Sequence, residues 1–216
     1  MRIQFSKIAF LAGFVLAMVF TFSCSSGGGG SGDGGWDNPS GGGVPFNENS
    51  QIYDREDGTL YKGSGIIKMP LGEDEDGNEI LMDAGSVTDG IVNLKLPTTI
   101  PDKYLTGVDK FDDDCFSFPK GTKMADGHFI LTTADNDNYL RLWIGYSDEQ
   151  IIEGINYLYF TKAGKITCKS DNEEMNIDAK AGWNKIYLHC QGSREHGYNR
   201  YFTNNILTKE VKWTIN

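Results

Sequence analysis

The sequence predicts an all-β fold, an antiparallel β-sandwich or a partly closed barrel, over residues 49–216. Two observations lead to it. Apolar and polar side chains alternate with period two through most of this region, which is the pattern of half-buried strands. Turn-forming residues, chiefly Gly, Asn and Asp, interrupt the alternation at short intervals. No stretch of ten residues places its apolar side chains at helical spacing, so we expect at most a helical turn at 101–105.

The turn residues delimit about ten short strands. Asp76-Gly77 separates the first two strands, and Thr88-Asp89-Gly90 precedes the third, which ends at Pro97. Further turns are expected at 135–138, Gly164, 171–172 and 181–182. The predicted strands are 60–69, 79–86, 91–96, 128–134, 139–146, 155–163, 165–169, 175–179, 183–191 and 208–215.

The strand at 139–146 shows how the alternation assigns faces. Because successive side chains of a strand point to opposite sides, residues of one parity share a face. One face carries Leu140, Leu142 and Ile144, and the other carries Tyr139, Arg141 and Trp143.

The first 23 residues have the organisation of a secretory signal. Arg2 and Lys7 give a positive start, and residues 8–22 follow without a charge. An uncharged run of this length is too short for a typical spanning helix, which needs about 20 apolar residues. Ser23 and Cys24 end the run.

A small residue and a cysteine after such a run resemble the signal of bacterial lipoproteins. The sequence departs from the commonest pattern at Thr21 and Phe22, as do relaxed signals of some Gram-negative groups. The resemblance implies cleavage before Cys24, acylation of its thiol and amine with fatty acids such as palmitate, and an anchor in the outer membrane. An ordinary cleaved signal and a short uncleaved anchor are the alternatives.

Residues 24–48 predict a tether. Ten of the twenty residues from 24 to 43 are glycine, a composition that behaves as a flexible coil with a root-mean-square span of about 25 Å. Loss of residues 1–23 removes Arg2 and Lys7 and no acid, so 18 basic residues remain against 30 acidic ones. This excess of negative charge argues against nucleic acid as a partner and against direct attraction to anionic lipid.

Two short motifs of the domain resemble a group of uncharacterised treponemal and Bacteroidetes lipoproteins. They are 182–185, Gly-Trp-Asn-Lys, and the turn and strand from Gly85 to Pro97. The resemblance covers residues 58–216. It implies a small β-sandwich lipoprotein and no assigned activity. From the residues alone, Gly182 suits a tight reversal and Trp183 suits packing over the end of the core.

Three cysteines remain besides Cys24, namely Cys115, Cys168 and Cys190. Disulfides can form in an exported chain, and an odd number of cysteines leaves one thiol outside any disulfide. We expect Cys168 and Cys190 to pair, because their strands could be near neighbours.

Residues for catalysis or metal binding are scarce. His128, His189 and His196 are the only histidines, and Cys190 beside His189 faces the opposite side of its strand. No nucleophile motif of the Gly-x-Ser-x-Gly type occurs, and the acidic runs at 73–76 and 112–114 suit solvated turns. We therefore expect no metal site, no cofactor and no enzymatic activity, with a hydrolase kept as an alternative.

Aromatic side chains provide the one candidate ligand platform. Tyr139 and Trp143 share a face of one strand, and Tyr157 and Tyr159 share a face of the next. Exposed rings on a sheet can stack on sugars or anchor a protein, whereas a covering layer would make them core.

The sequence thus predicts a lipid-anchored envelope protein with a non-catalytic binding or structural role. A carbohydrate-binding module is the first alternative. The membrane, through the lipid, is the expected partner, together with a glycan or a protein of the envelope or host. The sequence does not determine the ligand, the oligomeric state or whether the domain faces the periplasm or the cell surface.

Overall fold

The computed structural model describes residues 47–216, apart from 74–75, 109–116, 134–135, 149, 171, 194–196, 205–208 and 216. It is all-β, as the sequence predicts, with a large mixed sheet that bends into a sandwich-like arrangement. The expected helical turn is present as the short 3-10 helix η1 (Asp102–Tyr104).

Fourteen strands make up the sheet. They are β1 (Ile52–Asp54), β2 (Gly65–Glu73), β3 (Glu79–Thr88), β4 (Ile91–Leu94), β5 (Thr106–Gly107), β6 (Lys123–Asp126), β7 (Phe129–Thr133), β8 (Asn136–Ser147), β9 (Ile151–Phe160), β10 (Gly164–Lys169), β11 (Glu173–Ala179), β12 (Gly182–Ser193), β13 (Gly197–Thr203) and β14 (Lys212–Ile215).

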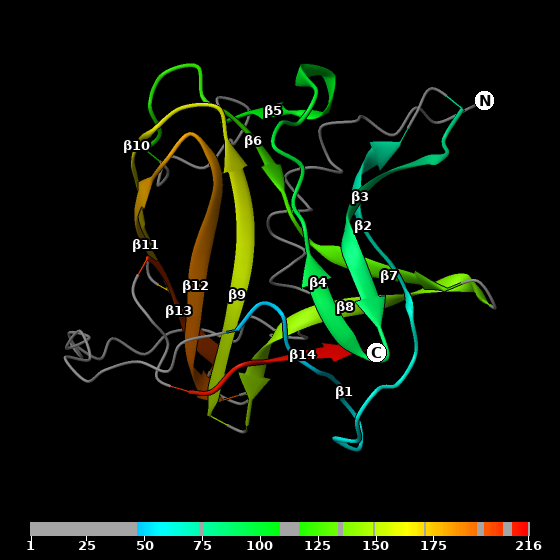
Figure 1. The fold of residues 1–216 in the computed structure, drawn as a ribbon. Coiled ribbons are helices and arrows are strands. Elements are labelled where there is room, and N and C mark those ends of the chain that lie inside the picture. Colours follow the sequence, from blue (N-terminus) through cyan, green and yellow to red (C-terminus); the bar gives the residue numbers. More distant parts are fainter. Residues whose placement is uncertain are drawn as a thin grey trace, which may run out of the picture.

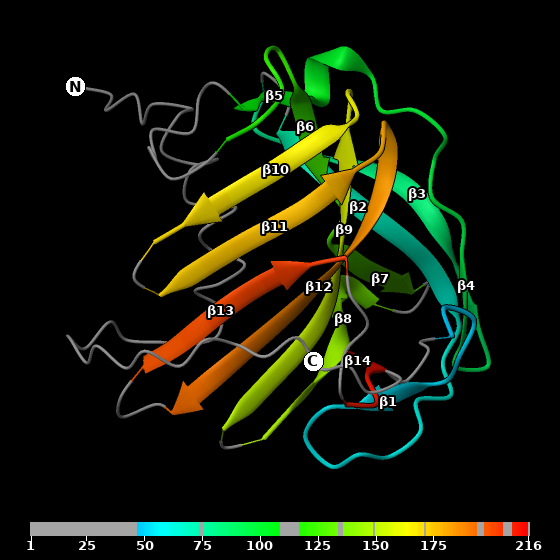
Figure 2. The ribbon, with the colours of Figure 1, turned by 90° about the vertical axis from the view of Figure 1, so that its left-hand side faces the viewer.

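Hydrogen bonding orders ten of these strands as β10-β11-β13-β12-β9-β8-β7-β2-β3-β4. Strand β14 pairs with β8 and β1, and β6 pairs with β9 and β5. In Figure 1 the group from β9 to β13 forms one side of the molecule, and β2, β3, β4 and β7 form the other. Figure 2 shows β10, β11, β13 and β12 side by side in one layer.

The predicted sheet differs from the observed one in two respects. Strands β1, β5, β6 and β13 fall in segments where no strand was predicted, since three of them are four residues or fewer. Two pairings are parallel, β1 with β14 and β11 with β13, where the sequence predicts an antiparallel sheet. Parallel partners are distant in the chain, and no turn between them marks the pairing.

Strands β9 and β12 are buried on both faces. Ile155 and Tyr157 of β9 pack in the larger core, which also holds Phe129, Ile144 and Trp213. Alternate residues of the same strands belong to a second core, which includes Phe160, Ile166, Ile177 and Ile186. A strand covered on both sides reads as a nearly continuous apolar run, and β9 reads Ile-Ile-Glu-Gly-Ile-Asn-Tyr-Leu-Tyr-Phe.

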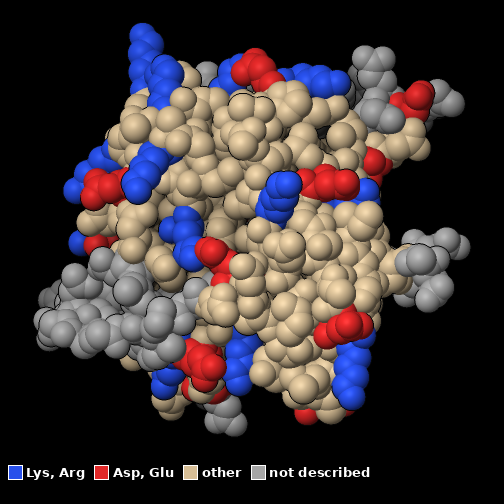
Figure 3. All heavy atoms as spheres, in the orientation of Figure 1, with Lys and Arg blue, Asp and Glu red and all other residues tan. Residues whose placement is uncertain are grey.

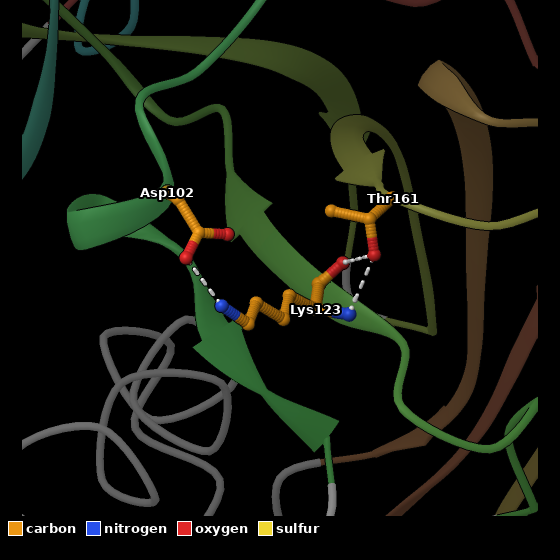
Figure 4. A network of polar contacts seen from close by, with 3 residues as sticks. All are labelled: Asp102, Lys123 and Thr161. Atoms are coloured by element: carbon orange, nitrogen blue, oxygen red, sulfur yellow. Dashed lines mark hydrogen bonds and ion pairs between the residues drawn. The ribbon is translucent and has the colours of Figure 1, made fainter.

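A polar network joins η1 to the end of β9. The Lys123 ammonium of β6 lies 2.5 Å from the Asp102 carboxylate, and the Lys123 amide donates to the Thr161 hydroxyl at 2.8 Å (Figure 4). Both charged side chains are largely exposed, so the ion pair contributes at most about 1 kcal/mol.

The turn between β3 and β4 has the conformation that its residues predict. Asp89 and Gly90 both have positive φ, 50° and 77°, as the central residues of a type I′ hairpin turn require. A Cβ atom on Gly90 would lie 1.8 Å from the Tyr61 carbonyl oxygen. Only glycine therefore fits there, on both dihedral and steric grounds.

Replacement of Gly90 by alanine should destabilise the protein by at least about 2 kcal/mol more than the same change at Gly58. Gly58 also has positive φ, 72°, but a Cβ atom added there would meet no other atom within 4 Å, so Gly58→Ala reports the dihedral cost alone. Urea unfolding of the two variants measures the difference. Equal losses would mean that the Tyr61 carbonyl is not in contact with the turn.

Candidate functional site

The four aromatic residues of the predicted platform do not share one surface. Tyr139 and Trp143 lie on the outer face of β8, whereas Tyr157 and Tyr159 point from β9 into the larger core. Tyr139 and Trp143 share a face of β8, and Tyr157 and Tyr159 share a face of β9, as the sequence predicts.

Only one of the four rings is largely open to solvent. Tyr139 is 45% exposed and Tyr157 is 4% exposed. The Tyr159 ring packs edge-on against Trp183 at 5.4 Å, and the Arg55 guanidinium lies over the Trp143 ring at 4.8 Å. The four rings therefore do not form the predicted platform. The period-two pattern assigns each ring to a face of its strand, but it does not reveal that this face of β9 is covered by other residues.

The predicted disulfide between Cys168 and Cys190 is wrong. Cys168 is disulfide-bonded, and Cys190 is a buried thiol. The reason is strand order: β11 and β13 lie between β10, which carries Cys168, and β12, which carries Cys190. Three strand spacings of about 4.8 Å exceed the Cα separation that a disulfide spans. Cys24 and Cys115 lie outside the described residues.

A buried hydrogen bond between a glutamate and a histidine lies where β9 and β12 meet. The Glu153 side chain is fully buried and the His189 side chain is 8% exposed, and the two residues are directly opposite in the register. Nδ1 of His189 lies 2.8 Å from one carboxylate oxygen of Glu153. The other oxygen accepts the Lys209 amide at 2.7 Å. Both oxygens of this buried carboxylate thus have hydrogen-bond partners, as its burial requires.

Neighbouring strands extend this pair into a row across the sheet. Tyr146 of β8 is paired with Glu153, and Tyr201 of β13 is paired with His189. The rings of His189 and Tyr201 are 6.3 Å apart. Sequence reasoning missed this row, because the strand order that assembles it leaves no local signal.

The contact between Glu153 and His189 can orient the imidazole ring. A carboxylate on Nδ1 fixes a histidine ring, as it does in hydrolases that use the other nitrogen as a base. Cys190, the adjacent thiol, belongs to the cluster with Ile152 on the opposite face, as the sequence predicts. Among the described residues no group of three or more His, Cys, Asp or Glu side chains could hold a metal ion. His196 lies outside the described residues.

Two further titratable side chains, Asp126 and His128, are half-buried beside β7. One carboxylate oxygen of Asp126 is buried without a hydrogen-bond partner. Burial raises the pKa of Asp126 from 3.8 to about 7. Burial, with a smaller contribution from the charge of Arg141, lowers the pKa of His128 from 6.5 to about 4.

Glu48, which the sequence assigns to the tether, contacts the domain instead. Its carboxylate pairs with the Lys185 ammonium and accepts the Tyr157 hydroxyl at 3.0 Å. Its backbone oxygen accepts the Trp213 indole N–H at 3.0 Å. Burial alone would raise the pKa of Glu48, but the hydrogen bonds and the charge of Lys185 together lower it. No alternation surrounds Glu48, so the sequence carried no signal of this contact.

Comparisons with protein-family models, with curated proteins and with solved structures found no match. Within the part of the chain that the structure describes, no helix has the length and apolar character needed to cross a bilayer.

The disulfide partner of Cys168 should be Cys115. Ser117 and Thr167 exchange backbone hydrogen bonds of 2.7 and 3.2 Å, so the chain two residues before Ser117 can reach Cys168. Cys24 is expected to carry lipid. Mass spectrometry of unreduced peptides should therefore recover a 115–168 linkage, with Cys190 alkylated only after unfolding. A peptide that links Cys190 to any other cysteine would contradict this assignment.

Asp126 should make the protein less stable as pH rises towards neutrality. The unfolded chain loses this proton near pH 3.8, whereas the folded protein keeps it to about pH 7. Between these values the folded state holds more protons, so the free energy of unfolding falls with rising pH and this contribution levels off above 7.

Asp126→Asn should remove this part of the slope, and the exposed Asp178→Asn should leave it unchanged. Urea unfolding at a series of pH values measures both variants. A wild-type slope in Asp126→Asn would show that this carboxyl is ionised in the folded protein.

Proposed function

We propose that this chain is a lipid-anchored protein of the bacterial cell envelope, with a β-sandwich domain in a non-catalytic binding or structural role. The supporting observation is the order of segments: an apolar signal that ends at Cys24, a glycine-rich tether, and a β-domain that contacts the chain from Glu48 onward. The outer membrane is the proposed location.

A binding or structural role is favoured over catalysis because the buried polar groups near His189 are engaged with one another. The Glu153 carboxylate is fully occupied by His189 and the Lys209 amide, inside a strand pair that is covered on both faces. The adjacent thiol of Cys190 faces away from that pair. The hydrolase alternative has the orienting carboxylate, but the nearest cysteine in the sequence cannot reach the imidazole on the same face.

The surface seen in Figure 3 fits a partner that is not strongly charged. Acidic and basic side chains are scattered over this face, and uncharged residues cover most of its middle. We propose an envelope or host protein as the partner class. The carbohydrate-binding alternative loses most of its support, because Tyr139 alone among its four rings is largely exposed.

Substitution of Cys24 by alanine should abolish acylation and release the protein into the soluble fraction. Alanine has no sulfur to receive the thiol-linked lipid, and the acyl chains supply the membrane affinity at about 0.8 kcal/mol per buried CH2. Fatty-acid labelling and fractionation measure both effects. Ser25→Ala, next to the acylated residue, is the matched control and should stay lipidated. Membrane association that survives Cys24→Ala without label would overturn the proposed anchor.

A further inference from the structure

Lysines gather at one end of the sheet, although the chain as a whole is acidic. The segments that meet there are 101–105, 118–123, 161–165 and 178–182. They carry six lysines, which we call the lysine end, namely Lys103, Lys120, Lys123, Lys162, Lys165 and Lys180. In these four segments, all of which the structure describes, the only acidic residues are Asp102 and Asp178. The net charge of the chain therefore conceals a local excess of positive charge.

The strand register brings these segments together. Phe160, at the end of β9, is paired with Gly182 of β12 and with Met124 of β6. Gly164, at the start of β10, is paired with Ala179 at the end of β11. The turns after β9 and β11 and the loop before β6 thus lie side by side, at the top of Figure 1. Basic side chains predominate along the same upper edge in Figure 3.

Part of this positive charge has a local partner. Lys123 pairs with Asp102 at 2.5 Å, and Lys165 lies opposite Asp178 in the register of β10 and β11. The Lys103 ammonium lies over the aromatic ring of the next residue, at 4.6 Å from its centre. These contacts account for three of the six lysines.

The other three, Lys120, Lys162 and Lys180, are exposed and pair with no carboxylate among the described residues. The Lys162 ammonium donates to the backbone oxygen of Lys120 at 2.6 Å, a contact that joins two of these segments and removes neither charge. Like charges that are held on one small surface repel one another, and a partner with negative charges relieves this repulsion. The lysine end therefore fits an anionic partner.

The chain enters the described domain within reach of this end. Glu48 is held by Lys185 and Tyr157, each of which lies three residues, or about 10 Å, from the lysine-end terminus of its strand. The composition of residues 24–43 predicts a coil with a span of about 25 Å, which exceeds this distance. A lipid on Cys24 would hold the lysine end near a layer of headgroups.

We infer that the lysine end is a docking surface for the anionic phosphate headgroups of the membrane that carries the anchor. The inference rests on the proposed lipid anchor for the choice of membrane, whereas the charge distribution stands without it. The net charge argues against attraction of the chain as a whole, but headgroups within a Debye length, about 8 Å at physiological salt, respond to the local charge. Docking by one end fixes the orientation of a domain that a flexible anchor alone would leave variable.

Sedimentation with vesicles tests this surface in the soluble form made by Cys24→Ala, to which no lipid anchor contributes. At low salt this form should bind vesicles that contain phosphatidylglycerol more tightly than vesicles of phosphatidylcholine alone, and high salt should abolish the difference. The triple variant Lys120→Gln, Lys162→Gln, Lys180→Gln should bind the anionic vesicles at least about tenfold more weakly, since each lysine near such a surface contributes about fivefold.

Two matched variants separate the place of the charges from their number. The triple variant Lys62→Gln, Lys169→Gln, Lys212→Gln removes as much charge from exposed lysines elsewhere and should bind nearly as well as the wild type. Arginine in place of the three lysines of the lysine end keeps the charge and should preserve binding. Equal losses in the two glutamine variants, or equal binding to both kinds of vesicle, would overturn the inference.

Two further outcomes would assign the lysines to a different partner. Binding to soluble polyphosphate but not to the vesicles would make the partner an anionic polymer. Vesicle binding that appears only after Asp112, Asp113 and Asp114 are changed to asparagine would mean that this acidic run neutralises the lysines. The run lies outside the described residues. Either result would overturn the docking surface.

A second measurement uses the lipidated, full-length protein in the same two kinds of vesicle. On the anionic vesicles an amine reagent should acetylate the three glutamine-tested lysines of the lysine end about three to ten times more slowly, and the three control lysines at an unchanged rate. Failure of lipidation would leave vesicle binding by the Cys24→Ala form intact. Failure of docking would leave membrane association through the lipid untouched, so the two proposals fail separately.

Discussion

The pairing of β9 with β12 is the constraint on which the rest of the structure depends. Ten residues of each strand are in register, from Gly182 opposite Phe160 to Gln191 opposite Ile151. One face of the pair supplies the larger core and the other supplies the second core. Because both faces are covered, each fully buried side chain of the pair has to be apolar or to have a polar partner. The unusual features of this domain follow from that requirement.

The polar residues of the pair illustrate it. Glu153 would be costly in this position if it were alone, and the register supplies His189 directly opposite while the chain supplies the Lys209 amide. Such a buried polar pair adds little net stability, but loss of one partner leaves a buried polar group unsatisfied and costs about 1–3 kcal/mol. The pair therefore selects one register, since a shift of one residue would move Glu153 and His189 to opposite faces.

Much of the fold could be predicted from local patterns. Alternation identified the main strands and assigned Leu142 and Trp143 to opposite faces, and Asp89-Gly90 marked its turn. Strand partners could not be predicted, because a parallel partner such as β14 for β1 lies at the other end of the chain. The disulfide was misassigned for the same reason: β11 and β13 separate the strands of Cys168 and Cys190.

The candidate site was harder to predict than the fold, since burial depends on what covers a strand. Tyr157 and Tyr139 look equivalent in sequence, but one is 4% and the other 45% exposed. Glu48 shows the converse case. It lies next to a segment whose composition predicts no structure, and it is held by residues more than one hundred positions away. Long-range polar contacts of this kind leave no periodic trace.

The position of Glu48 has a physical reason beyond stability. A chain that enters a sandwich exposes backbone groups where it enters. Here Trp213 donates to the Glu48 carbonyl, and Lys185 and Tyr157 bind its side chain, so the entry point is closed in part by two aromatic residues that the larger core already holds in place. Since β1 then pairs with the C-terminal strand β14, the beginning and the end of the domain are joined to each other before either meets solvent. Strand β14 also pairs with β8, so the segment that begins the domain is connected to an inner strand of the sheet instead of to an edge strand.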